Sequence, residues 1–459
     1  MKRLLQSEFF SKYGTLVVLL LLLAYYGIIT VDVQNPITPG AGRSLAREIV
    51  AEHGEAANVI ILVRDIDGDR PFAEALKDEL VRQDANIVDL VHLKSQPGYS
   101  RNAAITLDSV GESKIHAIVT HDPGTSWGPL KESKLKERGT AFAETKVHKP
   151  ASYTWPTFLT SGNLLNIVNS NAEIFIVAIG MTMVIITAGI DLSVGSMLAL
   201  SGVLTAVMIQ SAGGAEASIF AIIFCALMGM AICTLCGTFS GTMITVFRIP
   251  AFIVTLALMM IARGLAYIIN VRYNSMLSGG TGAPVAIKIE AEAFSWLGKG
   301  EFLYIPNPIL LTAFLLIAAH IVMTRTSFGR YVYAVGGNPE AAKLSGIRVG
   351  LVLTLVYTIC GALTGLAGIL NASRFESGNP ADGNLYELQV IAAVVVGGTS
   401  LAGGEGRIIG TLIGAMIIAV IENGLNMAGV DKYEQQVVFG LLILAAALVD
   451  QLKKRTEKT

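Results

Sequence analysis

The feature that most constrains this chain is a succession of apolar runs that fills residues 157–452. Most of the runs approach the roughly 20 residues that a helix needs to cross a bilayer core, and the two beside the glycine-rich stretch 397–406 are among the shortest. Charged residues make up only 15% of the chain, against about a quarter in a soluble domain. We therefore predict an all-α polytopic membrane bundle. Its ten predicted spans lie near 14–31, 172–189, 194–211, 217–239, 250–271, 307–324, 350–372, 387–400, 408–424 and 434–450.

Basic residues predict how the spans are oriented. Lys2 and Arg3 precede the first run, which places the N-terminus in the cytoplasm, and an even number of spans returns the C-terminus to the same side. The chain then divides into four parts. They are an N-terminal tail with the first span (1–31), an inserted domain (32–156), the main transmembrane domain (157–452) and a cytoplasmic tail (453–459).

The inserted residues 32–156 are polar and contain no apolar run of membrane length. Their pattern alternates strands with helices, which predicts a small α/β domain with a parallel sheet. The predicted elements are strands at 58–63, 86–91 and 115–120 and helices at 71–83 and 100–110. This order is similar to one lobe of a type I periplasmic sugar-binding protein. Because the segment follows the first span, we expect it outside the cytoplasm, either as a docking or sensing lobe or as an accessory domain that binds no small molecule.

Two glycine-rich turns interrupt the apolar runs, at residues 189–195 and 397–406. Glycine permits close backbone approach and positive φ angles, so both turns are candidate hinges of a gate. Asp191 has a simpler alternative role, as the N-cap of a helix that starts at Leu192. The candidate gate or hinge residues are Asp191, Ser193, Gly195, Gly397, Gly398, Gly403 and Gly404.

The loop between Thr324 and Gly350 contains a short helix signal. Asn338 suits an N-cap, Pro339 the first helical position and Gly346 a helix end. The pattern predicts a short exposed helix on the cytoplasmic face, and taken alone it is a plain connector.

Three ionisable residues fall within predicted spans or beside them: Arg263, Glu387 and Glu422. A charge at membrane depth needs an acidic partner, backbone carbonyls or water. Arg263 therefore forms either a structural pair, with Glu387 and Glu422 as candidate acids, or part of a translocation pathway.

A polar group follows the span that ends near residue 372. Asn, Asp, Glu and Arg side chains read sugar hydroxyls, and aromatic rings stack on them. The same loop could instead receive a binding protein or be an ordinary solvated loop. The group consists of Arg374, Glu376, Asn379, Asp382, Asn384 and Glu387, with Phe375 and Tyr386 nearby.

Several chemistries find no support in the sequence. It contains no G-x-x-x-x-G-K-[ST] loop, no H-E-x-x-H and no nucleophile elbow, so we expect a chain that is not an enzyme and binds no cofactor itself. The six histidines are scattered, which predicts no metal site, and a net charge of −1 gives no reason to expect nucleic acid.

Five ordered motifs together resemble the permease subunit of ribose-type ABC sugar importers, in the branched-chain-amino-acid/ribose permease superfamily. The motifs are 178–185, 189–195, 326–338, 336–347 and 392–411. The resemblance implies a homodimer in the bacterial inner membrane, a partner ATPase that holds ATP and Mg, and a periplasmic sugar-binding protein. It also implies import of a monosaccharide or small polyol. The coupling helix that docks on the ATPase would be Asn338, Pro339, Glu340, Ala341, Ala342, Lys343, Leu344, Ser345 and Gly346.

The inserted domain departs from this resemblance, because such permeases pass directly from the first span to the next. We expect the insertion to lie over the outer mouth, where it holds or partly replaces the binding protein. Two other functions stay open on the residues alone: a secondary transporter or channel that works without ATP, and a membrane-anchored sensor that uses residues 32–156 as its receptor.

Overall fold

The computed structural model describes residues 8–457 apart from 67, 97, 111–112 and 279–282. Lys2 and Arg3, on which the predicted orientation depends, lie outside the described residues. The chain forms two compact units. Unit 1 combines the N-terminal residues up to Thr30 with residues 158–459, and unit 2 comprises Val31–Thr157.

Unit 2 is built on four parallel strands in the order β3-β2-β4-β5. Side chains alternate along the central strand β2, so Val59 and Ile61 belong to the core under α3 and α4, whereas Ile60 and Leu62 belong to the core under α5. The elements are β1 (Val31–Gln34), α3 (Pro39–His53), β2 (Asn58–Arg64), α4 (Arg70–Arg82), β3 (Asn86–Leu93), α5 (Tyr99–Ser109), β4 (Ala117–Val119), α6 (Asp122–Thr125), η1 (Gly128–Leu130), α7 (Glu132–Lys136), η2 (Thr140–Phe142), β5 (Lys146–His148) and β6 (Tyr153–Pro156). The three predicted strands and two predicted helices are confirmed.

The chain enters and leaves unit 2 along a two-stranded antiparallel ribbon. Strands β1 and β6 pair from Val31 with Pro156 to Gln34 with Tyr153. In unit 1, the residues next to this ribbon also meet, because the Phe158 N–H donates to Thr30 Oγ1 at 3.2 Å and the Phe158 ring stacks on Tyr26 at 5.3 Å. The insertion therefore begins and ends at one place.

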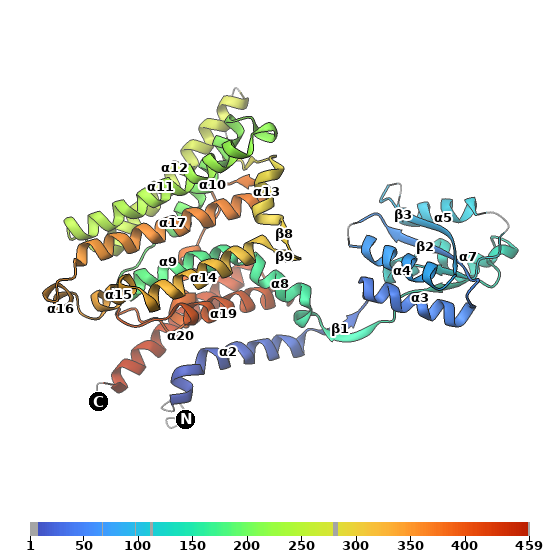
Figure 1. Cartoon of the computed structure of the whole chain (residues 1–459), viewed down its shortest axis with the longest axis horizontal. Coiled ribbons are helices and arrows are strands. Elements are labelled where there is room, and N and C mark those ends of the chain that lie inside the picture. Colours follow the sequence, from blue (N-terminus) through green and yellow to red (C-terminus); the bar gives the residue numbers. More distant parts are fainter. Residues whose placement is uncertain (1–7, 67, 97, 111–112, 279–282, 458–459) are drawn as a thin grey trace. The chain divides into compact units, whose positions relative to one another are not determined.

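Unit 1 is almost entirely helical (Figure 1). The N-terminal helix of this unit is α2 (Glu8–Ile29), and the others follow the insertion. They are α8 (Ser161–Ser170), α9 (Ala172–Ile186), α10 (Val194–Ser211), α11 (Ile219–Val246), α12 (Ala251–Ser278), α13 (Glu292–Lys299), α14 (Asn307–Arg325), α15 (Ser327–Gly337), α16 (Pro339–Leu344), α17 (Val349–Phe375), α18 (Tyr386–Val396), α19 (Ile408–Met427) and α20 (Lys432–Glu457). Short pieces connect them: η3 (Thr157–Leu159), η4 (Gly214–Glu216), β7 (Ile287–Lys288), β8 (Glu301–Phe302), β9 (Ile305–Pro306) and β10 (Ser377–Gly378).

Six of the described helices are long and apolar enough to cross a membrane: α10, α11, α12, α14, α17 and α19. Helices α8 and α9, bent by 49° at their junction, form a seventh span if counted together. The apolar part of α2 and the 11-residue α18 are shorter. Each of the ten predicted spans overlaps a helix, but the described helices support six or seven membrane crossings, so the count of ten stays a prediction.

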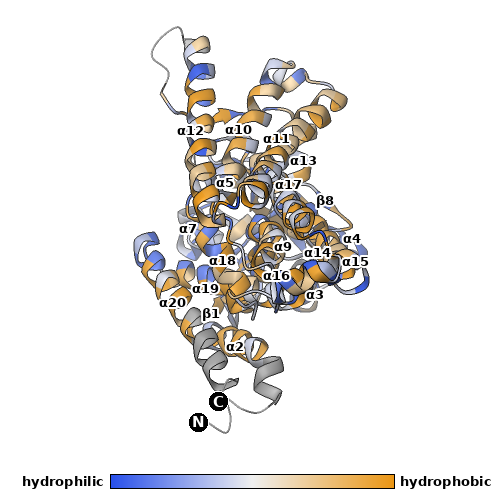
Figure 2. Cartoon of the chain, turned by 90° about the vertical axis from the view of Figure 1, so that its left-hand side faces the viewer, coloured by the Kyte–Doolittle hydropathy of each residue, from blue (hydrophilic) through white to orange (hydrophobic). Residues whose placement is uncertain are grey.

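Large apolar side chains face outward on the long helices, as a lipid solvent requires. Phe220 is 82% exposed and Leu235 66% exposed on α11, and Met260 is 70% exposed on α12. Figure 2 shows hydrophobic residues continuing around these helices. Helices α11 and α17 run side by side at backbone contact, since a Cβ on Gly237 would lie 2.2 Å from the Tyr357 carbonyl oxygen.

Candidate functional site

The predicted short helix after Asn338 is present as α16, and its caps are those the sequence indicates. Asn338 is the N-cap residue, and its Oδ1 accepts a hydrogen bond from the Ala341 N–H at 3.0 Å. Pro339 occupies the first position, and Gly346 follows the helix with φ of +83°. Six residues cannot form a stable helix by themselves, so these caps and the flanking packing hold α16 in place.

Helix α16 presents nearly all of its side chains outward. Ala342 is the one buried residue of the helix, and it fixes α16 to unit 1. Leu344 is 89% exposed, and Glu340 and Lys343 are exposed as well. The exposed surface of α16 therefore combines one large apolar side chain with two charged ones.

Helix α15, which leads into α16, was not predicted from the sequence. It packs directly on the glycine-rich turn at 397–406. A Cβ on Gly336 would lie 1.8 Å from the Ile186 carbonyl oxygen at the end of α9 and 2.7 Å from the Gly404 nitrogen. The Gly404 N–H donates to the same Ile186 oxygen at 2.8 Å, and the Tyr333 hydroxyl donates to the Gly406 carbonyl at 2.8 Å.

The two candidate hinge turns and the α15–α16 segment therefore meet at one end of unit 1. In the 397–406 turn, Gly398, Gly403 and Gly404 have positive φ, and Gly397 lies against the Gly410 carbonyl of α19. Ala188, beside the other turn, lies 2.9 Å from the position a Gly403 Cβ would take. These backbone contacts leave no free space between the segments. A displacement of α16 would therefore be transmitted through α15 to both turns.

Asp191 is completely buried in the turn between α9 and α10. Its Oδ1 accepts from the Ser193 N–H at 2.9 Å and from the Ser193 hydroxyl at 2.6 Å. Its Oδ2 has no hydrogen-bond partner among the described residues. The expected N-cap role at a helix starting from Leu192 is wrong, because α10 begins at Val194 and the N-cap position is Ser193. Asp191 instead closes a tight turn just before the helix.

At the start of α10, Gly195 allows the loop before α18 to approach. A Cβ on Gly195 would lie 2.1 Å from the Gly383 carbonyl oxygen and 2.6 Å from Glu387 Oε2. Arg263 on α12 holds the same loop, because its Nη1 donates to the Pro380 carbonyl at 2.6 Å and the Asp382 carbonyl at 2.7 Å. Among the partners predicted for Arg263, the structure therefore shows backbone carbonyls as its hydrogen-bond acceptors.

The acids predicted as partners of Arg263 are placed differently from each other. Glu387, in the first turn of α18, lies close enough to Arg263 to interact electrostatically. Glu422 on α19 interacts with Lys432 instead. The structure thus places Glu387, but not Glu422, in the Arg263 neighbourhood.

The structure contains a buried ion pair that was not predicted from the sequence. Arg374 Nη2 lies 3.1 Å from Glu173 Oε1, and Arg374 Nη1 donates to the Asn169 carbonyl at 2.9 Å. Glu173 is 1% exposed in the first turn of α9. The signal available was a lone acid inside an apolar run, which demands a partner.

The rest of the predicted polar group is also largely occupied within the chain. Glu376 pairs with Lys299 at 2.8 Å, and Asp382 Oδ2 accepts from Asn371 Nδ2 at 2.8 Å. These partners make the group a structural network around the loop 376–385. The interpretation that its members bind sugar stays a prediction.

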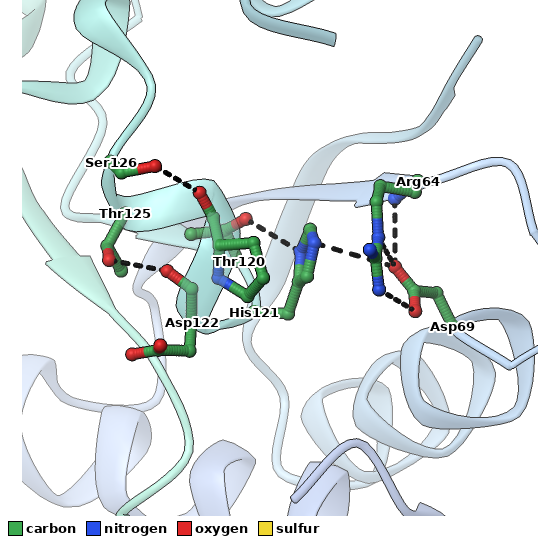
Figure 3. Close-up of polar contacts among 8 residues, drawn as sticks. Arg64, Asp69, Thr120, His121, Asp122, Thr125 and Ser126 are labelled. Carbon is green, nitrogen blue, oxygen red and sulfur yellow. Dashed lines mark hydrogen bonds and ion pairs between the residues drawn. The ribbon is translucent and has the colours of Figure 1, made fainter. Parts of the chain in front are cut away.

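Unit 2 has a polar cluster at the carboxyl edge of its sheet (Figure 3). Arg64, at the end of β2, donates from Nε and Nη2 to the two oxygens of buried Asp69, each at 3.0 Å. His121, just after β4, places Nε2 3.7 Å from Asp69 Oδ2. Burial lowers the pKa of His121, while Asp69 opposes the shift. Strands β2 and β4 flank the point where the strand order reverses, which is where open α/β sheets bind ligands.

The scattered histidines are partly brought together by the fold of unit 2. Ligand atoms of Glu52, His53 and His148 all lie within 4.8 Å of one another. The sequence predicted no such cluster, because the residues come from the end of α3 and from β5, far apart along the chain.

Comparison with known proteins gives consistent matches. Residues 163–447 match the family model described as branched-chain amino acid transport system, permease component. The ribose import permease protein RbsC of Escherichia coli (strain K12) is 43% identical over 302 residues, which is 65% of this chain and 88% of that protein. The Bacillus subtilis (strain 168) protein of the same name is 42% identical over 298 residues, 65% of this chain and 87% of that protein.

A third relative, the xylose transport system permease protein XylH of Escherichia coli (strain K12), is 34% identical over 355 residues, 66% of this chain and 89% of that protein. No solved structure matches the chain. The family match begins at residue 163, after the last residue of unit 2. Unit 2 thus lies outside the matched region.

Proposed function

Because this chain belongs to the family of branched-chain amino acid transport system permease components, we propose that it carries a monosaccharide of the ribose or xylose class across the membrane. Its relatives include ribose and xylose import permeases, which indicates the permease component of an ABC sugar importer. It is a multi-pass protein of the inner membrane and a non-catalytic subunit. An ABC permease works with an ATPase and a substrate-binding protein, so ATP and Mg belong to the ATPase partner.

The observation that carries the mechanism is the contact chain from α16 to the two hinge turns. We propose that residues 338–346 are the coupling helix, which docks in the ATPase. ATP-driven movement of α16 would be transmitted through Gly336 to the end of α9 and to Gly404. The turns at 189–195 and 397–406 would then switch access to a central pathway between two copies of the chain.

Orientation follows from the same assignment. A coupling helix must lie in the cytoplasm, where the ATPase is, and this agrees with the basic residues that precede α2 and those at the C-terminal end of α20. We propose that both termini are cytoplasmic and that unit 2, reached after the first span, is extracytoplasmic. In intact cells, a cysteine placed at Leu344 should then be inaccessible to a membrane-impermeant thiol reagent. The same cysteine should be labelled once the membrane is permeabilised and the reagent reaches the cytoplasmic face.

The coupling role is tested by changing the exposed side chains of α16. Leu344→Asp and Glu340→Arg should each release the ATPase from the purified complex and abolish sugar-stimulated ATP hydrolysis, since both side chains are exposed on the proposed docking surface and lie outside the core of unit 1. Tyr304→Asp is the matched control, because Tyr304 is 93% exposed beyond the opposite end of α14. If the α16 variants keep full ATPase association and coupling, the assignment fails.

We further propose that unit 2 holds or partly replaces the sugar-binding protein. The Arg64–Asp69–His121 cluster at the switch point of its sheet, in which Asp69 and His121 are buried, supports a recognition role rather than a spacer. Deleting residues 36–150 and joining the β1–β6 ribbon with a short turn should leave the permease folded but reduce uptake and weaken binding-protein association. Unchanged uptake and association in the deletion would eliminate this role.

A further inference from the structure

Two imidazole rings in unit 2 face each other at unusually short range. His53 Nε2 and His148 Nε2 are 3.0 Å apart, and the rings are nearly perpendicular, at 89°. His53 lies in the last turn of α3 and His148 ends the edge strand β5. If both imidazoles are neutral and no cation is present, one Nε2 carries a proton and donates it to the other Nε2. The alternative is that both Nε2 lone pairs point toward a common cation.

A carboxylate completes the group. Glu52 Oε2 lies 4.0 Å from His148 Nε2, while Glu52 Oε1 accepts from Lys146 Nζ at 2.5 Å. In a tetrahedral zinc site with metal–nitrogen bonds of about 2.0–2.1 Å, neighbouring ligand atoms are about 3.3 Å apart. The two imidazoles are close to this spacing, and the Glu52 side chain, which is 37% exposed, has room to move closer to them.

We propose that Glu52, His53 and His148 form a binding site for a first-row divalent cation, with Zn²⁺ the best match. Imidazole nitrogens with one carboxylate are typical zinc ligands, and three protein ligands leave a fourth position for water. Mg²⁺ and Ca²⁺ prefer an all-oxygen set and are excluded by the two imidazoles.

The nearby His116 is not a fourth ligand. Its ring centroid is 6.5 Å from that of His53, and its Nδ1 already accepts a hydrogen bond from the Asn58 N–H at 2.9 Å. This acceptor role places the ring proton on Nε2, so His116 offers no lone pair to a metal in this arrangement. The site therefore has three protein ligands.

The proposed site is independent of the transport function. It would fasten the end of α3 to the edge strand β5, and His53 and His148 are 95 positions apart in the sequence. A cation at this point closes a long loop and stabilises unit 2 by binding the folded form alone.

The test uses the full chain, purified in detergent without a polyhistidine tag. Titration with Zn²⁺ should show one ion bound per chain, and Co²⁺ should give the visible absorption bands of a four-coordinate site. Mg²⁺ should not compete. His53→Ala and His148→Ala should each weaken Zn²⁺ binding by at least about 100-fold, the upper range for loss of a residue that merely orients a ligand.

Two further variants separate a metal site from a simple imidazole–imidazole hydrogen bond. His320→Ala, in unit 1, should leave Zn²⁺ binding unchanged and so controls for adventitious histidine ligation. Lys146→Met removes the cation that competes for Glu52 and should tighten Zn²⁺ binding severalfold. Absence of Co²⁺ bands in the unaltered chain, or equal Zn²⁺ affinity in the His53→Ala and His320→Ala variants, would overturn the proposal.

Discussion

Single residues determine how closely elements approach at the α16 end of unit 1. Gly336 and Gly337 are adjacent in the sequence and have opposite surroundings. A Cβ on Gly336 would overlap backbone atoms of Ile186 and Gly404, whereas a Cβ on Gly337 would meet nothing within 4 Å. Adding one methyl group at either of these two adjacent positions therefore tests the proposed transmission path.

Gly336→Ala should destabilise the permease by about 1–3 kcal/mol, the usual cost of overpacking where backbone must shift. It should also reduce sugar-stimulated ATPase activity, because α15 moves away from the 397–406 turn. Gly337→Ala should match the unaltered protein in both thermal stability and coupled activity. If the two variants have equal thermal stability and equal coupled ATPase activity, the contact of α15 with that turn does not contribute to coupling.

The buried pair of Glu173 and Arg374 makes a second prediction at residue scale. Removing one member leaves an uncompensated buried charge, which costs about 3–5 kcal/mol. Arg374→Met should therefore lower thermal stability strongly, and adding Glu173→Gln should restore part of it. Thermal unfolding of the two single variants and the double variant measures this coupling. Additive losses would show that the two side chains do not interact.

At the scale of elements, α16 depends on its cap. Asn338→Ala removes the acceptor for the Ala341 N–H and should cost about 1 kcal/mol of local stability. Hydrogen exchange of residues 339–346 should speed up, and coupled ATPase activity should fall. Asn338→Asp is the control, because it keeps the acceptor and adds a favourable charge at the helix start. Equal exchange in the two variants would contradict a capping role.

Unit 2 should lose stability as the pH falls from about 7.5 to 5.5. Burial lowers the pKa values of His53, His121 and His148 below the ordinary 6.5, so the unfolded chain binds protons in this window before the folded unit does. Stability contributed by the neutral imidazoles is present above the unfolded pKa and is lost as the pH falls. The lowered carboxylate pKa of Glu79 acts in the same direction only at more acidic pH.

Hydrogen exchange of β2, measured with a metal chelator present, is the appropriate readout. His121→Asn should flatten the pH dependence, since it removes one of the three histidines whose pKa is lowered without touching the proposed cation site. Exchange rates that do not depend on pH in this window, after correction for the intrinsic chemical rate, would show that the histidines are equally easy to protonate in both states.

The elements that the sequence predicts are those encoded by local signals. Apolar runs locate α10, α14 and α17 to within a few residues, and Asn338 with Gly346 locates α16. Helix α15 was missed because its glycines weaken helix propensity, and contact with the 397–406 turn supplies the stabilisation. Contacts between distant segments, such as Arg374 with Glu173 and His53 with His148, depend on the three-dimensional arrangement, which periodicity does not contain.

At the scale of the whole molecule, the chain combines one unit that matches a known family with a second unit that lies outside the match. Residues 163–447 match a permease family, and the match supports the importer assignment that the motifs had indicated. Unit 2 lies outside that match, and its parallel sheet follows from alternating strand and helix patterns. Its role therefore rests on its own geometry, namely the polar cluster at the switch point and the imidazole pair.

The antiparallel pairing of β1 with β6 has a practical consequence for engineering. Thr30 and Phe158 are already in hydrogen-bond contact, so the permease presents one narrow attachment point that accepts any domain whose two ends lie close together. A fluorescent protein, whose conformation responds to strain at its ends, could replace residues 36–150 at this position. Such a chimaera would report movements of the first span optically during the transport cycle.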